Sequence, residues 1–166
     1  MIRDIFEKSI LIFGCGNVLL GDDGFGPAVI QYLKDHYPLP REVLALDVGT
    51  SIRELLFDLL LSAKKPAKII IIDTVDYPGK KPGEVFEIPV AGIPAQKTAD
   101  FSLHQFPTVN MLQELKDHSQ IDIRIIAAQI ATLPEELRTG LSPPVAEAVA
   151  IAGEEIYQMI KLGEGG

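Results

Sequence analysis

The sequence contains a single cysteine, Cys15, among its 166 residues. One thiol cannot form an internal disulfide, which favours a reducing compartment, and it cannot supply a zinc or iron–sulfur site made of several cysteines. Basic clusters are also scarce: beyond the pairs Lys64-Lys65 and Lys80-Lys81 there are none, and the net charge is −8. This acidic balance argues against a nucleic-acid binder and against contact with an anionic membrane.

Long apolar runs are missing as well. None approaches the roughly 20 residues that a transmembrane helix needs, and the charges among the first eight positions do not fit a signal peptide. Repeats, low-complexity tracts and linkers are not found. The length fits one domain over residues 1–166, and 47% hydrophobic residues suffice for a core. We therefore expect a single cytoplasmic domain that binds neither nucleic acid nor membrane.

Strand-like and helix-like segments alternate along the chain. Short apolar runs predict strands at 9–13, 43–47, 68–72, 84–90 and 122–127. Apolar residues at helical spacing and helix-start signals predict helices at 27–34, 52–62, 102–116 and 143–162. Pro89 fits the fourth strand to an edge position. The alternation predicts an α/β fold: a single doubly wound, mostly parallel (mixed) sheet of about five strands with helices on both faces.

The stretch LIFGCGNVLLGDDGFGPAVI, residues 11–30, joins an apolar strand to a glycine-rich loop. A dinucleotide site needs the spacing G-x-G-x-x-G, in which glycines allow a tight turn and close approach to a pyrophosphate. The first two glycines fit, but the third position is Leu19, and no G-K-S/T follows. Asp22 and Asp23 would also repel a phosphate, by roughly 4 kcal/mol per charge pair at an effective dielectric of 20. The loop therefore disfavours a nucleotide ligand.

The acids point instead to a cation. In a doubly wound sheet, ligands bind at the carboxyl ends of the strands, so the residues directly after each strand are the informative ones. Asp23 lies in the loop after the first strand, Asp73 follows the central strand, and His104 stands at a predicted helix start. Two carboxylates and one imidazole can hold a metal ion and leave positions open for water or substrate. We expect either Asp22 or Asp23 to share one ion with Asp73 and His104.

Each of these residues also has a structural interpretation. An Asp-Asp pair before Gly-Phe-Gly-Pro is often a turn or a helix cap, and Asp73 could accept backbone N–H groups at a strand end. His104 alone is more typical of a polar helix start or a surface position. Cys15 is interpreted as a packing residue, because glycines flank it and no histidine is near it in the sequence.

Several motifs occur in order along the chain. They are G-C-G-N-x-L-x-x-D-D-G-x-G-P at 14–27, D-x-G-T at 47–50, I-I-D-T-V-D at 71–76, P-G-E-V at 82–85 and S-L-H-Q at 102–105. Together they resemble the hydrogenase maturation endopeptidases over nearly the whole domain. The resemblance implies that the chain removes a short C-terminal extension from the large-subunit precursor of a nickel–iron hydrogenase, after nickel has been inserted.

The resemblance also implies which residues act. Members of this family use a carboxylate from the glycine-loop pair, an aspartate after the central strand and a histidine before a helix, which correspond to Asp23, Asp73 and His104. Three further polar residues are candidates for a supporting role only: Asn17, Asp22 and Asp76. The family often has two glycines before the Thr or Ser of the second loop, where this chain has Val48. The shape of that loop is therefore an open point.

The chemistry expected from these residues is that of an unusual peptidase. The sequence has no H-E-x-x-H motif and no convincing Ser-His-Asp set. We expect the nickel held by the precursor to be the metal that Asp23, Asp73 and His104 recognise. The nickel could polarise the scissile carbonyl or activate water, or a carboxylate could act as the general base. The residues leave these routes open.

Two other functions are compatible with parts of the pattern. Related archaeal proteins are sometimes treated as a delta subunit of the deazaflavin-reducing hydrogenase, which makes a nickel-dependent binding module without peptidase activity the second interpretation. A nucleotide-binding α/β domain is the third, and the two acids of the glycine loop argue against it.

Overall fold

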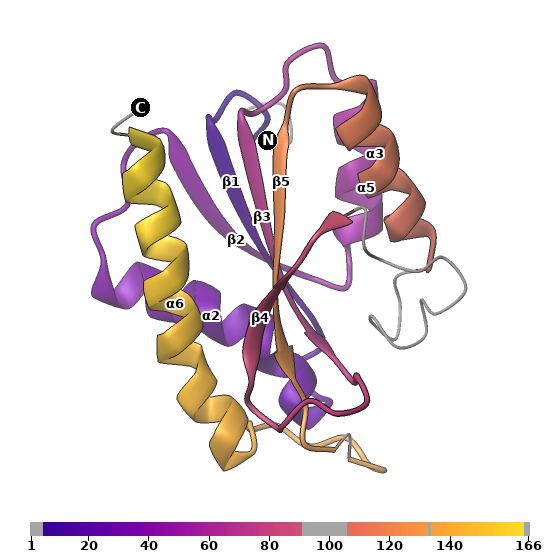
Figure 1. The fold of residues 1–166 in the computed structure, drawn as a ribbon, viewed down its shortest axis with the longest axis vertical. Helices are drawn as coiled ribbons and strands as arrows, with labels where there is room; N and C mark the ends of the chain where they lie inside the picture. Colours follow the sequence, from indigo (N-terminus) through magenta and orange to yellow (C-terminus); the bar gives the residue numbers. More distant parts are fainter. Residues whose placement is uncertain (1–4, 91–105, 133, 165–166) are drawn as a thin grey trace.

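The computed structural model describes residues 5–90, 106–132 and 134–164 (Figure 1). Its strands are β1 (Ile10–Cys15), β2 (Val43–Gly49), β3 (Lys68–Val75), β4 (Val85–Ile88) and β5 (Asp122–Gln129). Its helices are the 3-10 turn η1 (Gly21–Gly24), α2 (Phe25–His36), α3 (Ile52–Leu61), α5 (Phe106–His118) and α6 (Pro143–Glu164). None of the helices in these residues is both long and apolar enough to cross a membrane.

The strands form one sheet in the order β2-β1-β3-β5-β4. The first four run parallel, and β4 pairs antiparallel with β5 at an edge. This is the predicted mixed sheet, including the edge position of the strand before Pro89. Because Gly14 of β1 pairs with Ile72 of β3, the carboxyl ends of these two strands are neighbours. The loops that follow β1 and β3 therefore meet at the same end of the sheet, where the parallel strands finish (Figure 1).

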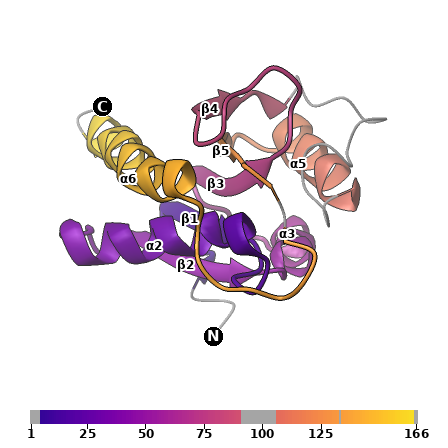
Figure 2. The same cartoon turned by 90° about the horizontal axis from the view of Figure 1, so that it is seen from below.

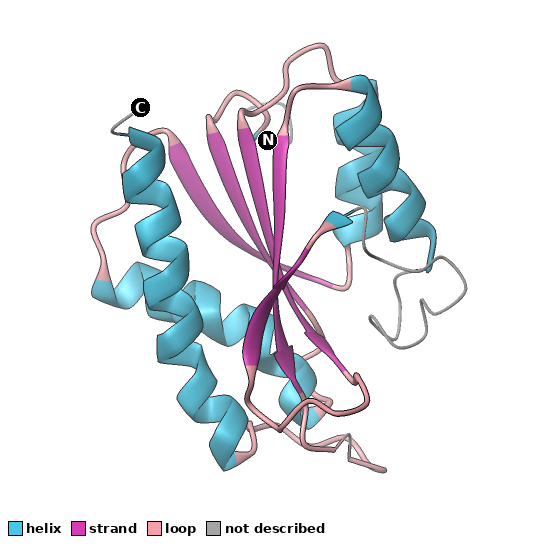
Figure 3. Ribbon diagram, viewed as in Figure 1, coloured by secondary structure: helices cyan, strands magenta, loops and turns pink. Residues whose placement is uncertain are grey.

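Helices cover both faces of the sheet, as predicted. Figures 1 and 3 show α2 and α6 on one face and α3 and α5 on the other. The side chains of β3 alternate between the two layers, so that Ile70 and Ile72 pack with α2 and α6 while Ile69 and Ile71 pack with α3 and α5. Both faces of β3 are thus buried, which explains why its sequence is apolar without alternation.

The predicted elements are present, with boundaries that differ at several ends. The central strand continues through Asp73 and Thr74 to Val75, because Thr and Val suit a strand as well as the preceding isoleucines do. Asp73 therefore lies inside the strand rather than after it. Helix α2 begins at Phe25, before Pro27, which places the proline in the first turn. The predicted S-x-x-Q helix start at 102–105 lies outside the described residues.

Two glycines bring helix α2 against the end of β1. A Cβ on Gly26 would lie 2.3 Å from the carbonyl oxygen of Cys15, 2.5 Å from its nitrogen and 2.8 Å from the carbonyl oxygen of Ile72. A Cβ on Gly14 would lie 2.5 Å from the carbonyl oxygen of Gly26. These are backbone atoms that cannot rotate away, so only glycine permits this approach. The start of α2, and the acidic loop before it, are thereby fixed over the sheet.

Gly26→Ala tests this packing. In an exposed helix interior, glycine to alanine stabilises by about 1 kcal/mol. Here the methyl group would overlap backbone of β1 and β3, so we expect the opposite sign and a loss of about 3 kcal/mol in the free energy of unfolding. Urea unfolding measures this, with the exposed Lys34→Ala on the same helix as the control. A Gly26→Ala protein as stable as the control would show that α2 does not need this contact.

Candidate active site

The loop after β1 folds back on itself at Gly16. This residue has a φ of +136°, and a Cβ on it would lie 1.8 Å from the carbonyl oxygen of Asp23. The loop continues as the 3-10 turn η1, whose four residues are all buried. The backbone of Asp23 is therefore pressed against the turn that ends β1. The glycines of this motif serve close backbone packing around an acid, in place of a phosphate cradle.

Asp23 is a buried acid with fixed hydrogen bonds, since only 2% of its surface is exposed. One carboxylate oxygen accepts the backbone N–H of Asn17 at 2.8 Å, and the other accepts the hydroxyl of Thr74 at 3.0 Å. Asn17 thus supports Asp23, as predicted, but through its backbone. Its side-chain oxygen accepts the N–H of Leu19 at 2.9 Å and shapes the turn. Hydrogen bonds to a carboxylate hold its orientation.

Asp73 is equally buried, with 2% of its surface exposed, and it accepts the backbone N–H of Thr74 at 2.8 Å. Thr74 therefore contacts both acids, through its N–H to Asp73 and through its hydroxyl to Asp23. Asp23 thus contacts Thr74, the residue that follows Asp73 in the central strand. Thr74 itself was not predicted as a site residue. The only signal was its place next to Asp73 in the central strand.

The third predicted ligand, His104, lies outside the described residues. Helix α5, which begins at Phe106, packs on the same face as Ile71 and Val75 of β3. By strand alternation, Asp73 belongs to this face too. Among the described residues, no three or more His, Cys, Asp or Glu side chains are grouped so that they could hold a metal ion. The shared three-ligand site stays a prediction.

Asp22 has a different role from Asp23, although both are buried. Its carboxylate accepts the N–H of Ala131 at 2.9 Å, and the N–H and hydroxyl of Ser142 at 2.6 and 2.9 Å. These residues belong to the loop between β5 and α6, more than 100 positions along the chain. Asp22 thus fastens the two loops together. Its predicted supporting role is that of a tie between loops rather than of a direct partner of Asp23.

A buried glutamine holds the loop after β3. Gln129, at the end of β5, accepts the N–H of Tyr77 at 2.8 Å and donates to the carboxylate of Asp76 at 3.0 Å. Only 4% of Gln129 is exposed. Asp76 is itself exposed, and its bond from Gln129 shapes this loop. Gln129 was not predicted, although a polar residue that closes an apolar strand is a recognisable signal for a cleft-side position.

Cys15 is a packing residue, as predicted. It is 1% exposed, and burial raises the pKa of its thiol, with the negative charges of Asp73 and Asp23 raising that pKa further. A neutral, enclosed thiol is a poor nucleophile. The influence of both acids on this pKa indicates that Cys15 lies near Asp73 and Asp23. Cysteine-based peptidase chemistry therefore does not fit this site.

The end of β2 is compatible with valine at the position where a second glycine was expected. Val48 is buried in the apolar layer under α3, and no non-glycine residue among those described has a positive φ. Gly49 alone supplies the left-handed conformation, with a φ of +55°. Its carbonyl oxygen accepts the N–H of Gly16 at 2.9 Å, so this loop is tied to the acidic loop.

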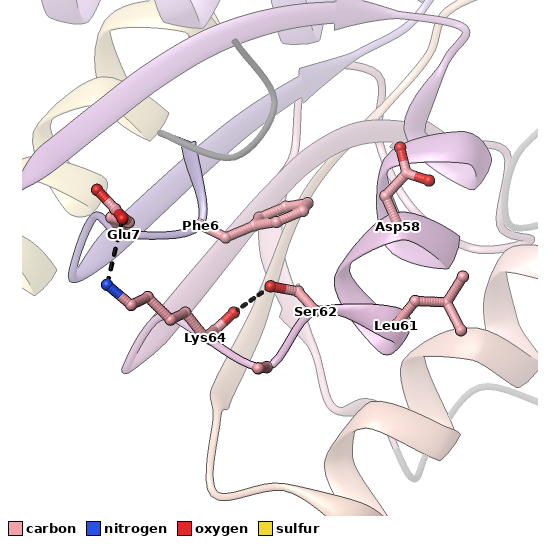
Figure 4. A pocket seen from close by; sticks show the side chains of 7 residues that line it. Phe6, Glu7, Asp58, Leu61, Ser62 and Lys64 are labelled. Atoms are coloured by element: carbon pink, nitrogen blue, oxygen red, sulfur yellow. Dashed lines mark hydrogen bonds and ion pairs between the residues drawn. The ribbon is translucent and has the colours of Figure 1, made fainter.

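A separate surface pocket lies at the opposite end of the sheet, away from the carboxyl ends of the strands (Figure 4). Its lining precedes β1 and β3, so it stands at the amino ends of the strands, and it includes Phe6, Asp58 and Leu61. The ion pair between Glu7 and Lys64 at its rim is exposed. No pair of buried acids lines it, and the candidate site therefore remains at the carboxyl ends.

Comparison with known proteins places the chain in a family. The family described as hydrogenase maturation protease matches residues 27–159. A protein of Methanocaldococcus jannaschii, provisionally named a hydrogenase maturation protease, is 38% identical over 93% of this chain and 98% of that protein. The coenzyme F420 hydrogenase subunit delta of Methanothermobacter thermautotrophicus is 32% identical over 93% of this chain and 96% of that subunit.

A solved structure agrees with this assignment. The hydrogenase maturating endopeptidase HybD from Escherichia coli has the same fold, with a TM-score of 0.74 and 28% identity over 93% of each chain. This chain belongs to the hydrogenase maturation protease family. It is accordingly a hydrolase that acts on peptide bonds, built on an α/β sheet with two buried acids at the strand ends.

Asp22→Ala tests the tie between the two loops. The substitution leaves two backbone N–H groups and a hydroxyl without their acceptor, so we expect a loss of about 3 kcal/mol in the free energy of unfolding. Ser142→Ala removes only the hydroxyl from the same contact and should cost about 1 kcal/mol. Urea unfolding compares the two. Equal losses would show that the carboxylate of Asp22 does not hold the loop between β5 and α6.

Proposed function

We propose that this enzyme removes the C-terminal extension from the large-subunit precursor of a nickel–iron hydrogenase, after nickel insertion. The observation that carries the proposal is that two buried acids, Asp23 and Asp73, each accept a hydrogen bond from Thr74 near the carboxyl ends of β1 and β3. Membership of the hydrogenase maturation protease family supports the choice of substrate. The single cysteine is consistent with an enzyme that cleaves this precursor in a reducing cytoplasm.

The metal in this proposal comes with the substrate. Two buried carboxylates repel each other, and a divalent cation between them offsets that repulsion. A carboxylate oxygen that accepts one hydrogen bond has a second lone pair, so Asp23 and Asp73 can keep their partners and still bind nickel. Imidazole is a suitable nickel ligand, and His104 would complete the set. A precursor without nickel would lack this contact, so binding would report that insertion has taken place.

Two routes to hydrolysis fit these residues. In both, water adds to the scissile carbonyl, the carbon–nitrogen bond breaks, and the leaving amine takes up a proton. In the first route, the substrate's nickel acts as a Lewis acid on the carbonyl or on the water. In the second, the carboxylate of Asp23 or Asp73 takes the proton from water as a general base. Cys15 has no part in either route, because its thiol is buried and neutral.

Replacing any of the three proposed ligands should abolish processing. We expect Asp23→Asn, Asp73→Asn and His104→Ala each to lower the rate of cleavage of nickel-loaded precursor by at least about a hundredfold, as loss of a catalytic group does. The mass of the precursor, followed by mass spectrometry, reports the release of the C-terminal peptide. Asp35→Asn is the control, because Asp35 is an exposed acid on α2 whose carboxylate accepts a hydrogen bond from Gln31.

Circular dichroism and melting temperature establish that each variant is folded. A folded variant that cleaves at near the wild-type rate would remove its residue from the site. If Asp35→Asn lost activity as well, the loss would be due to removal of a negative charge at any position and not to a change in the site.

Nickel dependence is tested on the substrate. We expect the wild-type enzyme to cleave nickel-loaded precursor and to leave nickel-free precursor intact, because the acids then lack the cation that they recognise. The two forms are compared at equal concentration by gel shift and mass spectrometry, with nickel content determined by elemental analysis. Efficient cleavage of the nickel-free form would end the idea of a nickel checkpoint, while leaving the peptidase assignment in place.

A second candidate function is supported by the relative that is named a delta subunit of coenzyme F420 hydrogenase. Such a subunit would bind the nickel-loaded protein without cutting it. Stable binding of the precursor with no release of peptide would favour this function over the first.

A further inference from the structure

Exposed apolar side chains gather beside the candidate site. Within the described ranges, six large apolar residues are strongly exposed: Val18 (48%), Leu19 (45%), Phe57 (53%), Leu61 (72%), Leu137 (70%) and Ile151 (53%). Single exposed apolar residues are common and need no explanation. Val18, Leu19 and Leu137 differ, because they stand on two loops that are joined at the carboxyl ends of the strands. We name these three side chains the apolar platform.

Backbone pairing brings the two halves of the platform together. Leu20 forms an isolated parallel bridge with Arg138. The N–H of Arg138 donates to the carbonyl of Leu19 at 2.8 Å, and the N–H of Gly21 donates to the carbonyl of Arg138 at 2.8 Å. In a parallel pairing, residues that precede the paired positions share one side, so Leu19 and Leu137 are neighbours. Figure 2 shows the loop between β5 and α6 passing the turn that follows β1.

Contacts within the chain hold the two loops of the platform together. The carboxylate of Asp22 holds Ala131 and Ser142, which lie on either side of Leu137 along the loop. A Cβ on Gly21 would lie 3.1 Å from the ring of Pro134, which shows how closely the two loops pack. A ligand that binds to a pre-formed surface does not have to order it, and this raises affinity.

The platform is continuous with the buried acids. The N–H of Asn17 donates to the carboxylate of Asp23, and Val18 is the next residue. A Cβ on Gly24 would lie 3.3 Å from the Cα of Val18, so Val18 rests against the residue that follows Asp23. An extended peptide advances about 3.3 Å per residue. A chain whose scissile bond lies at Asp23 therefore has its nearby residues over the platform.

We propose that the apolar platform binds apolar side chains of the substrate polypeptide next to the bond that is cut. This inference rests on the proposed function, because it takes the precursor as the polypeptide that Asp23 and Asp73 act on. The acids themselves are buried and polar and offer no apolar contact to a peptide. Three side chains are also far too few for a second copy of this chain, since a stable interface buries roughly 800 Å² on each partner.

The test compares two double variants. The platform variant is Leu19→Ser with Leu137→Ser, and the control variant is Leu61→Ser with Ile151→Ser, which removes two leucine-sized apolar side chains of similar exposure elsewhere on the surface. Affinity for nickel-loaded precursor is measured by biolayer interferometry, and kcat and KM for peptide release are measured by mass spectrometry. We expect the platform variant to raise Kd and KM by about tenfold, from lost apolar contact, with kcat within about twofold.

The control variant should match the wild type in all three quantities. Leu137→Ser alone, at the more exposed position, repeats the test if the double variant melts early. The inference would be overturned if the platform and control variants had equal effects, or if the platform variant changed kcat alone. It would also be overturned if the platform variant altered the oligomeric state of the free protein. A wild-type protein that neither binds nor cuts the precursor would overturn the proposed function, and a protein that binds without cutting leaves the platform to be judged by Kd.

Discussion

The site depends on how closely the acidic loop packs against the ends of β1 and β3. Gly16 leaves no room for a side chain beside the carbonyl of Asp23, and Gly26 leaves none beside the backbone of Cys15. The parallel pairing of β1 with β3 then sets Asp73 next to this loop. Because these contacts are between backbone atoms, the acidic loop has little freedom to move away from the strand ends. The fold thus buries both acids in a place where water is largely excluded.

Two neighbouring aspartates show how the same residue type divides into separate roles. Asp23 accepts hydrogen bonds from Asn17 and Thr74 at the strand ends, while Asp22 turns to the loop between β5 and α6. The 3-10 geometry of η1 separates their directions. Asp23 therefore contacts the ends of the strands, and Asp22 holds the neighbouring loop in place. Residue type and burial do not distinguish them, since both are aspartates and each is 2% exposed.

Local patterns in the sequence were sufficient for the sheet, the helices and the position of Asp23 and Asp73 near the carboxyl ends of neighbouring strands. Apolar runs predicted the strands and helices. The rule that parallel strands finish at the same end of a sheet predicted the placement of the two aspartates. The partners of Asp22 could not be predicted, because Ala131 and Ser142 are distant in sequence and donate mainly through the backbone. The hydroxyl of Thr74 donates to Asp23, 51 positions earlier in the chain, and this contact is evident only once the strand register is known. Residue type by itself does not reveal such contacts.

The central claim is that Asp23, Asp73 and His104 share one divalent cation. A crystal of the enzyme soaked in nickel, with anomalous diffraction at the nickel edge, tests it directly. The account predicts one ion with carboxylate oxygens of both acids and a nitrogen of His104 within about 2.0–2.3 Å. An ion bound away from the acids, or one held by the acids with the imidazole pointing elsewhere, would contradict it.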